Sequence, residues 1–230
     1  MNKTTIFTDG ASRGNPGRGG WGSVVVENDT VTELGGREDN TTNNRMEIRA
    51  AIAGLSHVGN ESQITINTDS SYVINGITKW VKGWQKNGWV TKTKDVVLNR
   101  DLWEKLVEAG HGKNIVWNYV GGHSGVIGNE RCDVIATSFA DGSPTDLYKG
   151  LFVNYSIKNI LDLSQVTEKV SKKSHSKATA YSYVSRVDGK ILTHKTWAEC
   201  EARVKGKSGT RYKKALSLDD EKQIIAEFGR

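Results

Sequence analysis

The chain has 230 residues, which suits one large domain or two modest ones, and its 36% hydrophobic content is low but sufficient for a core. No apolar run is long enough to span a membrane, and the few residues before the first predicted strand leave no room for a signal peptide. Cys132 and Cys200 lie far apart without a metal-like spacing, which is typical of buried thiols in an intracellular protein. We therefore expect a cytoplasmic monomer with no membrane partner.

The net charge of +6 is unevenly distributed. Residues 171–230 hold 14 Lys and Arg against 7 Asp and Glu, whereas residues 1–170 hold 18 against 19. The C-terminal part is therefore the part of the chain that attracts a polyanion. The alternative is that this basic tail only aids solubility.

The chain opens with a predicted meander of three strands. Residues 6–9 alternate between polar and apolar and end at Asp9, and the Gly- and Pro-rich residues 10–17 predict a turn. Residues 21–27 and 30–37 predict a hairpin. Taken alone, Asp9 is better explained as a residue that caps a turn.

A helix and a fourth strand follow the meander. Asn44 and Glu47 have the spacing of a capping box, which predicts a helix over residues 44–57 with Glu47 in its first turn. Residues 63–68 alternate again and are followed by Asp69. A helix between two strands favours a crossover and parallel pairing, which places Asp9 and Asp69 side by side at one sheet edge.

Residues 70–80 predict the next helix. Trp and Lys residues alternate in the segment that follows it. In residues 80–94 the spacing of aromatic rings and ammonium groups suits contacts with a sugar–phosphate backbone, with Trp80 and Lys86 as candidates. Simple packing of the Trp side chains explains the pattern equally well. Residues 99–109 predict a helix, and residues 114–120 a strand.

A glycine-rich loop at residues 121–129 carries His123. A helix follows it, and Asp133 lies beside the apolar face of that helix, near its predicted start. Asp9, Glu47, Asp69 and Asp133 would then repel one another unless cations lay between them. Ligation by oxygen alone indicates two Mg²⁺ or Mn²⁺ ions and the hydrolysis of a phosphodiester.

These motifs, in this order, resemble type 1 ribonuclease H over about residues 3–140. The resemblance lies in Thr-Asp-Gly at residues 8–10, Thr-Asn-Asn-Arg-Met-Glu at 42–47, Thr-Asp-Ser at 68–70, Gly-His at 122–123 and Asn-Glu-Arg-Cys-Asp at 129–133. It implies an α/β fold with a mixed five-stranded sheet flanked by helices. It also implies hydrolysis of the RNA strand of RNA–DNA hybrids, leaving 5′-phosphate and 3′-hydroxyl ends.

The resemblance further implies roles for single residues. Asp9 would bridge both metal ions, Asp133 would complete the ion that holds the attacking water, and Glu47 and Asp69 would hold the ion at the leaving oxygen. His123 would move a proton or help the product leave. Contacts with the hybrid would come from Asn15, Asn43 and Asn44, and from Trp80 and Lys86 in a segment like the family's basic protrusion.

The sequence changes character after residue 139. We expect residues 1–163 to form the catalytic domain with a C-terminal extension that packs back onto it, 164–179 to form a linker, and 180–230 to form a small α+β domain with a three-stranded antiparallel sheet. Residues 196–200 and 210–214 of that domain resemble the hybrid-binding domain of type 1 ribonucleases H, although in familiar eukaryotic members it precedes the nuclease. The resemblance implies duplex contacts, to a hybrid or double-stranded RNA, by Tyr183, Trp197, Lys213 and Lys214.

Three hypotheses compete. The first is a metal-dependent endonuclease on RNA–DNA hybrids, aided by its own binding module. The second is a duplex-binding protein with an inactive nuclease fold, which the four acids disfavour. The third is a related nuclease acting on DNA junctions or in strand transfer, which the string at residues 42–47 and His123 disfavour.

Overall fold

The computed structural model describes residues 3–59, 63–91, 93–122, 125–164, 180–187, 189–205, 207 and 210–229. The chain forms two compact units, Met1–Glu168 and Lys169–Arg230. His123, for which a role is predicted, lies outside the described residues. So do most of the predicted linker and parts of two turns in the second unit.

The sheet of the first unit begins with the predicted antiparallel meander. It consists of β1 (Lys3–Ser12), β2 (Gly17–Glu27) and β3 (Thr30–Thr41), paired in sequence order. These strands are longer than predicted, because the residues after Asp9 continue to pair with β2, as in Gly10 opposite Trp21. The turn predicted over residues 10–17 is therefore confined to the four residues between β1 and β2.

Three further strands complete the sheet. As predicted, β4 (Gln63–Thr68) is parallel to β1. The strand predicted over residues 114–120 is β5 (Asn114–Tyr119), which is parallel to β4. A short β6 (Lys149–Leu151) pairs antiparallel with β3, giving the order β5-β4-β1-β2-β3-β6. The expected count of five strands was wrong, because a three-residue strand is too short to show alternation in the sequence.

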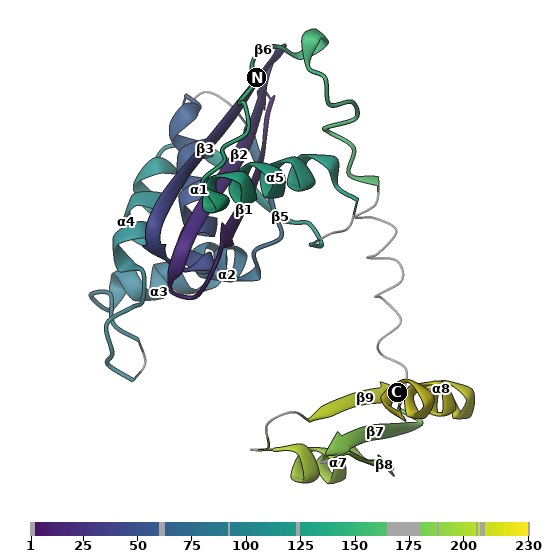
Figure 1. Ribbon diagram of the computed structural model, residues 1–230. Coiled ribbons are helices and arrows are strands. Elements are labelled where there is room, and N and C mark those ends of the chain that lie inside the picture. Colours follow the sequence, from purple (N-terminus) through teal and green to yellow (C-terminus); the bar gives the residue numbers. More distant parts are fainter. Residues whose placement is uncertain are drawn as a thin grey trace. The chain divides into compact units, whose positions relative to one another are not determined.

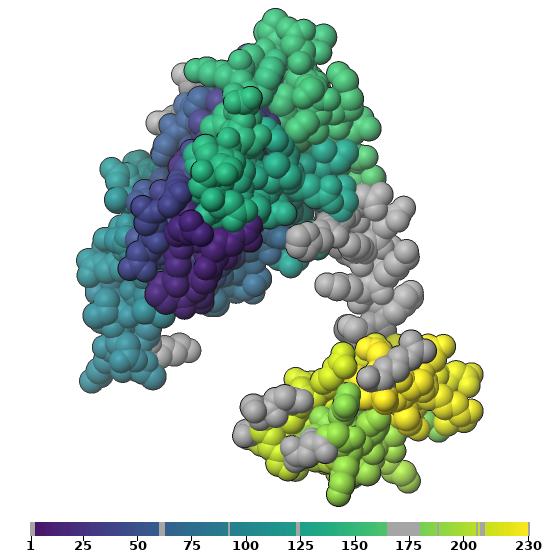
Figure 2. All heavy atoms as spheres, in the orientation of Figure 1, coloured from purple at the N-terminus to yellow at the C-terminus, as the bar shows by residue number. Residues whose placement is uncertain are grey.

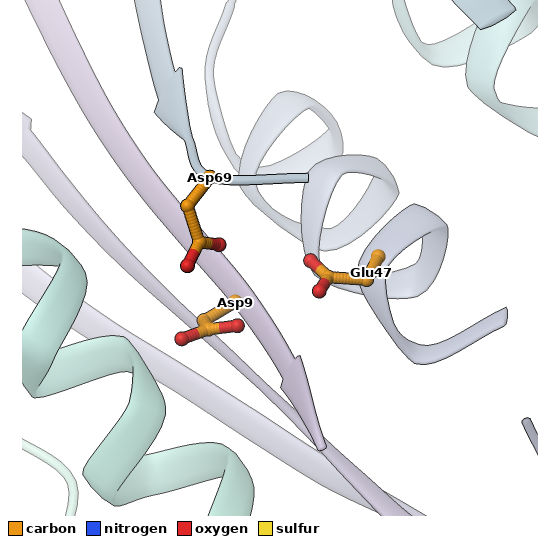
Figure 3. A group of neighbouring side chains, drawn as sticks. All are labelled: Asp9, Glu47 and Asp69. Atoms are coloured by element: carbon orange, nitrogen blue, oxygen red, sulfur yellow. The ribbon is translucent and has the colours of Figure 1, made fainter. Parts of the chain in front are cut away.

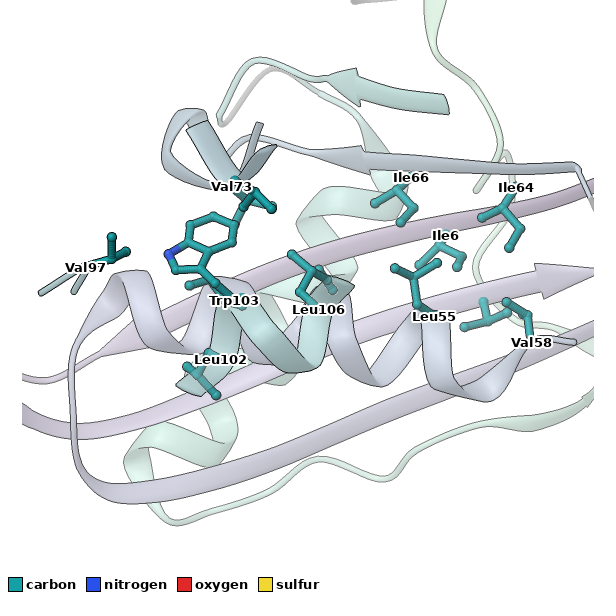
Figure 4. Close-up of a cluster of buried hydrophobic side chains, with 14 of the residues drawn as sticks. Ile6, Leu55, Val58, Ile64, Ile66, Val73, Val97, Leu102, Trp103 and Leu106 are labelled. Atoms are coloured by element: carbon teal, nitrogen blue, oxygen red, sulfur yellow. The ribbon is translucent and has the colours of Figure 1, made fainter. Parts of the chain in front are cut away.

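Helices cover both faces of this sheet (Figure 1). One face carries α1 (Asn43–His57), α4 (Arg100–Ala109) and the predicted helix after β4, which is continuous through α2 (Ser71–Asn75), a π-helical turn η1 (Gly76–Trp80) and α3 (Val81–Lys86). The other face carries α5 (Ile127–Asp141). Alternation along β1 places Ile6 in the first core and Phe7 in the second. Figure 4 shows Trp103 and Leu106 of α4 packed in the first core with Leu55 and Ile6.

The residues that follow α5 pack onto the first unit, as predicted. Tyr155, after the short 3-10 helix η2 (Phe152–Asn154), and Ile160 are buried in the same core as α5. In Figure 2 the green atoms of this segment lie against teal atoms of the same unit. No helix among the described residues is both long enough and apolar enough to cross a bilayer.

The second unit is the predicted small α+β structure. Its strands are β7 (Ser182–Val187), β8 (Lys190–His194) and β9 (Arg211–Ala215), in the antiparallel order β8-β7-β9. Its helices α7 (Trp197–Val204) and α8 (Leu218–Gly229) pack on opposite faces. Val184 contacts the α8 side of the core, and Val187 contacts Cys200 and Val204 of α7.

Candidate active site

Strand register brings the first two acids together. Thr8 of β1 lies opposite Thr68 of β4, so the next residues in each chain, Asp9 and Asp69, are neighbours. Gly10 then allows α1 to approach the strand closely, since a Cβ there would lie 2.4 Å from the backbone nitrogen of Glu47. The predicted juxtaposition at the carboxyl end of β4 is confirmed.

Glu47 reaches the same place from α1. The helix is capped by Thr42, whose hydroxyl accepts from the backbone N–H of Arg45, so the predicted capping by Asn44 was wrong. Glu47 lies in the second turn of the helix, where it does not serve as a cap. Asn43 Nδ2 donates to Glu47 Oε1 at 3.2 Å, while the buried Glu47 Oε2 has no hydrogen-bond partner among the described residues.

Three carboxylates form a tight group. One ligand atom from each of Asp9, Glu47 and Asp69 lies within 4.8 Å of the others, and the three side chains point toward one another in Figure 3. Burial, followed by the charge of Asp69, raises the pKa of Asp9 to about 8. Burial, followed by the charge of Asp9, also raises the pKa of Glu47. Because these acids lie close together and are shielded from water, a proton or a cation between them is favoured.

Asp133 lies farther from this group and lines the same cavity, which has a volume of about 210 Å³. The helix α5 begins at Ile127, so Asp133 is in its second turn and not near its start as predicted. The loop glycines misled the prediction, because Gly128 lies inside the helix where a Cβ would be 2.5 Å from the ring of Phe7. Thr137 Oγ1 donates to Asp133 Oδ1 at 3.3 Å.

Two further residues of the cavity were not predicted as site residues. Asn129 is buried with an Oδ1 that has no partner among the described residues, and Glu130 lies beside it. The signal was present in the sequence, since both belong to the Asn-Glu-Arg-Cys-Asp string that ends at Asp133.

The predicted substrate contacts around the cavity are exposed. Asn15 lies in the turn between β1 and β2, and Asn43 and Asn44 form the first residues of α1. Of these three, only Asn43 lines the cavity. Lys86 is exposed at the end of α3.

Most Trp side chains of the segment at residues 80–94 pack against other aromatic rings. Trp84 contacts Trp89 at 6.5 Å and Trp103 at 5.8 Å between ring centroids, and Trp89 is buried. Trp80 contacts Tyr72 and Trp84 but remains 39% exposed. Packing therefore accounts for most of this segment, and Trp80 is the side chain it leaves available to a ligand.

The second unit gathers aromatic rings on the α7 face of its sheet. Trp197 lies 5.6 Å from Tyr183 and 5.2 Å from Tyr212 between ring centroids. Lys214 lies opposite Tyr183 in the β7–β9 register and so shares this face. Tyr212 was missed by the sequence analysis, although it lies two residues from Lys214 on one strand.

Lys213 lies on the other face of that sheet. It is opposite Val184, and its Nζ is 3.0 Å from Glu227 Oε2 of α8. Lys213 and Lys214 therefore lie on opposite faces, because successive strand residues point to opposite faces. The duplex contact of Lys213 stays a prediction.

Comparison with known proteins identifies the family. The RNase H family model matches residues 1–141. The chain belongs to the RNase H family. A ribonuclease H of Erythrobacter litoralis is 50% identical over 141 residues, covering 61% of this chain and 98% of the relative, and one of Alcanivorax borkumensis is 48% identical over 141 residues, covering 61% and 93%.

A solved structure extends the likeness. A protein described as LC9-RNase H1, a type 1 RNase H with the type 2 active-site motif, superposes with a TM-score of 0.59 at 26% identity, covering 74% of this chain and 85% of the other. The chain is therefore an endoribonuclease. Ribonucleases H are the enzyme class that acts on RNA–DNA hybrids.

Proposed function

We propose that the enzyme hydrolyses the RNA strand of RNA–DNA hybrids with two Mg²⁺ ions, leaving 5′-phosphate and 3′-hydroxyl ends, and that Mn²⁺ can replace Mg²⁺. The observation that carries the proposal is the group of three carboxylates, two buried and one half-buried, within 4.8 Å of one another. In metal-dependent phosphoryl transfer such a group holds the cations that act on the phosphodiester.

The residues present fit a hard divalent cation. All the candidate ligands are carboxylate oxygens, which Mg²⁺ prefers over nitrogen and sulfur. The unpartnered Glu47 Oε2 and the raised pKa of Asp9 are both features that a bound cation would relieve. Asp9, Glu47, Asp69 and Asp133 would hold the ions.

The bound ions would polarise the phosphate and lower the pKa of an attacking water. The chain's own residues would position the substrate around them. Asn43 would keep Glu47 oriented through its 3.2 Å hydrogen bond, and the exposed Asn15 and Asn44 would contact the strand near the cut. His123, which lies outside the described residues, would move a proton or help the product leave.

The second unit would add affinity for the duplex. Tyr183, Trp197 and Lys214 offer aromatic surface and positive charge on one face, which suits sugars and phosphates of a hybrid or of double-stranded RNA. In this arrangement residues 1–163 are the catalytic domain, 164–179 a linker and 180–230 the binding domain. The enzyme would work as a cytoplasmic monomer.

A cleavage assay tests the proposal. RNA labelled at its 5′ end is annealed to DNA, with the same RNA alone and paired to RNA as controls, and each is incubated with Mg²⁺ or with EDTA. We expect cutting of the hybrid only, with Mg²⁺ only, and none by Asp9→Asn, which should still bind. Tight binding without any cutting by the wild type would favour the duplex-binding protein instead.

A further inference from the structure

A buried carboxylate outside the acid group lies near the start of β3. The side chain of Glu33 is 0% exposed, and both of its oxygens are paired. Arg131 donates to it from Nε and Nη2, each at 2.7 Å, Tyr148 donates its backbone N–H at 2.9 Å, and the hydroxyl of Tyr155 donates to Oε1. Burial alone would raise the pKa of Glu33, but these hydrogen bonds outweigh it and hold the pKa below its ordinary value.

These partners join three parts of the chain. Glu33 belongs to β3, Arg131 belongs to α5, and the two tyrosines follow α5 in the extension, beyond the residues that match the family model. Arg131 Nη2 also donates to the backbone oxygen of Asp146 at 3.1 Å, and the rings of Tyr148 and Tyr155 lie 5.0 Å apart. We call Glu33, Arg131, Tyr148 and Tyr155 the Glu33 clamp.

Glycines of β2 set how closely α5 approaches the sheet. The helix rests on glycines of β2, where a Cβ at Gly20 would lie 2.1 Å from Ala136 O and one at Gly22 would lie 2.5 Å from Cys132 O. Glycine lets the helix backbone touch the strand, but it offers no side chain to interlock with the helix. The orientation of α5 about its own axis therefore depends on side chains beside these glycines. Ile135 and Phe139 supply apolar contacts over Gly35, and the Glu33 clamp adds a buried and fully paired polar contact.

Asp133 is sensitive to that orientation. It lies two residues after Arg131, so the two side chains leave the helix about 200° apart, one toward the clamp and one toward the cavity. A turn of α5 by about 10° would move a carboxylate about 6 Å from the axis by about 1 Å. Asp133 already lies outside the group of three acids within 4.8 Å of one another. A movement of this size therefore decides whether Asp133 can bind the same metal ion as they do.

We propose that Glu33, Arg131 and Tyr155 are positioning residues, which set the rotation of α5 and so hold Asp133 in place for metal binding. The inference rests on the proposed function in one respect, that Asp133 is a metal ligand. It assigns the extension over residues 146–155 to the catalytic apparatus and not to a passive spacer.

Metal binding without substrate tests the clamp. Arg131→Lys keeps the charge but loses the paired hydrogen bonds, and Tyr155→Phe removes a single hydroxyl. Ile160→Val is the control, since Ile160 is fully buried in the same extension but is no part of the clamp. In calorimetric titration of the full-length protein with Mn²⁺, we expect affinity about tenfold weaker in Arg131→Lys, a smaller loss in Tyr155→Phe and no change in Ile160→Val.

Equal Mn²⁺ affinity in all three variants, with melting temperatures lowered alike, would overturn the proposal and leave the clamp a purely structural contact. A second measurement needs no metal. Amide hydrogen exchange over residues 129–133 should become faster in Tyr155→Phe and stay unchanged in Ile160→Val, and identical exchange would also overturn it. Failure of the proposed metal site looks different, since Asp9→Asn would then bind Mn²⁺ as the wild type does.

Discussion

Asp9→Asn should stabilise the metal-free protein at pH 8, although it removes a proposed metal ligand. Burial, and then the charge of Asp69, raise the pKa of Asp9 from 3.8 to about 8. The folded state therefore holds this proton more tightly than the unfolded chain, and stability is lost as the pH rises from about 4 to about 8. Each pKa unit corresponds to about 1.4 kcal/mol, which sets an upper limit of about 6 kcal/mol on the loss.

Asparagine escapes this loss because it stays neutral, and its carbonyl can keep the hydrogen bond that Gly10 N–H donates to Asp9 Oδ1 at 2.7 Å. Local relaxation reduces the effect, so we expect a gain in unfolding free energy of about 2–4 kcal/mol at pH 8 and about a third of that or more at pH 5. Urea unfolding in EDTA at both pH values measures it. Saturating Mg²⁺ should shrink or reverse the gain, because only the wild type keeps all its ligands.

Two results would refute this reasoning. One is a gain of equal size at pH 5 and pH 8, which would mean that the substitution acts through packing and not through the charge of Asp9. The other is a loss of stability in EDTA at pH 8, which would mean that the acids of the cavity do not strain the metal-free fold.

The remaining predictions concern the contact between α5 and the glycines of β2, and the second unit. Gly20→Ala should lower the free energy of unfolding by about 3 kcal/mol or more in urea titrations, because the new Cβ would meet the backbone oxygen of Ala136 at 2.1 Å. A loss below about 1 kcal/mol would contradict the close approach of α5 to β2. Lys214→Ala should weaken hybrid binding in equilibrium titrations, whereas Lys213→Ala should not, and equal losses would place both on the binding face. Deleting residues 171–230 should raise the hybrid dissociation constant and flatten its salt dependence while single-turnover cleavage stays near normal; an unchanged salt slope would give the unit another role.

The sequence predicted the part of the fold that local rules govern. Alternation gave the strands, and a helix between two of them gave the parallel pairing of β1 with β4. That pairing was enough to place Asp9 beside Asp69, which the register of Thr8 with Thr68 confirms. The positions of Glu47 and Asp133 were predicted less well, because both depend on where a helix begins.

Glycine explains two of the errors in element boundaries, those of β1 and α5. In sequence a cluster of glycines indicates a turn, but Gly10 lies within a strand and Gly128 within a helix. Both positions have a tertiary cause, a close approach of backbone or of an aromatic ring that no residue with a Cβ would allow. The same limit hid β6, whose pairing with β3 rests on long-range contacts of the extension.

The four acids depend on different parts of the chain. Strand register places Asp9 and Asp69, and the passage of α1 over Gly10 places Glu47, all within the residues that the family model matches. Asp133 also lies within that match, but the clamp on its helix draws on the tyrosines beyond residue 141. If the clamp positions Asp133, substitutions in residues 146–155 should alter the contribution of this one acid and leave the group of three unchanged.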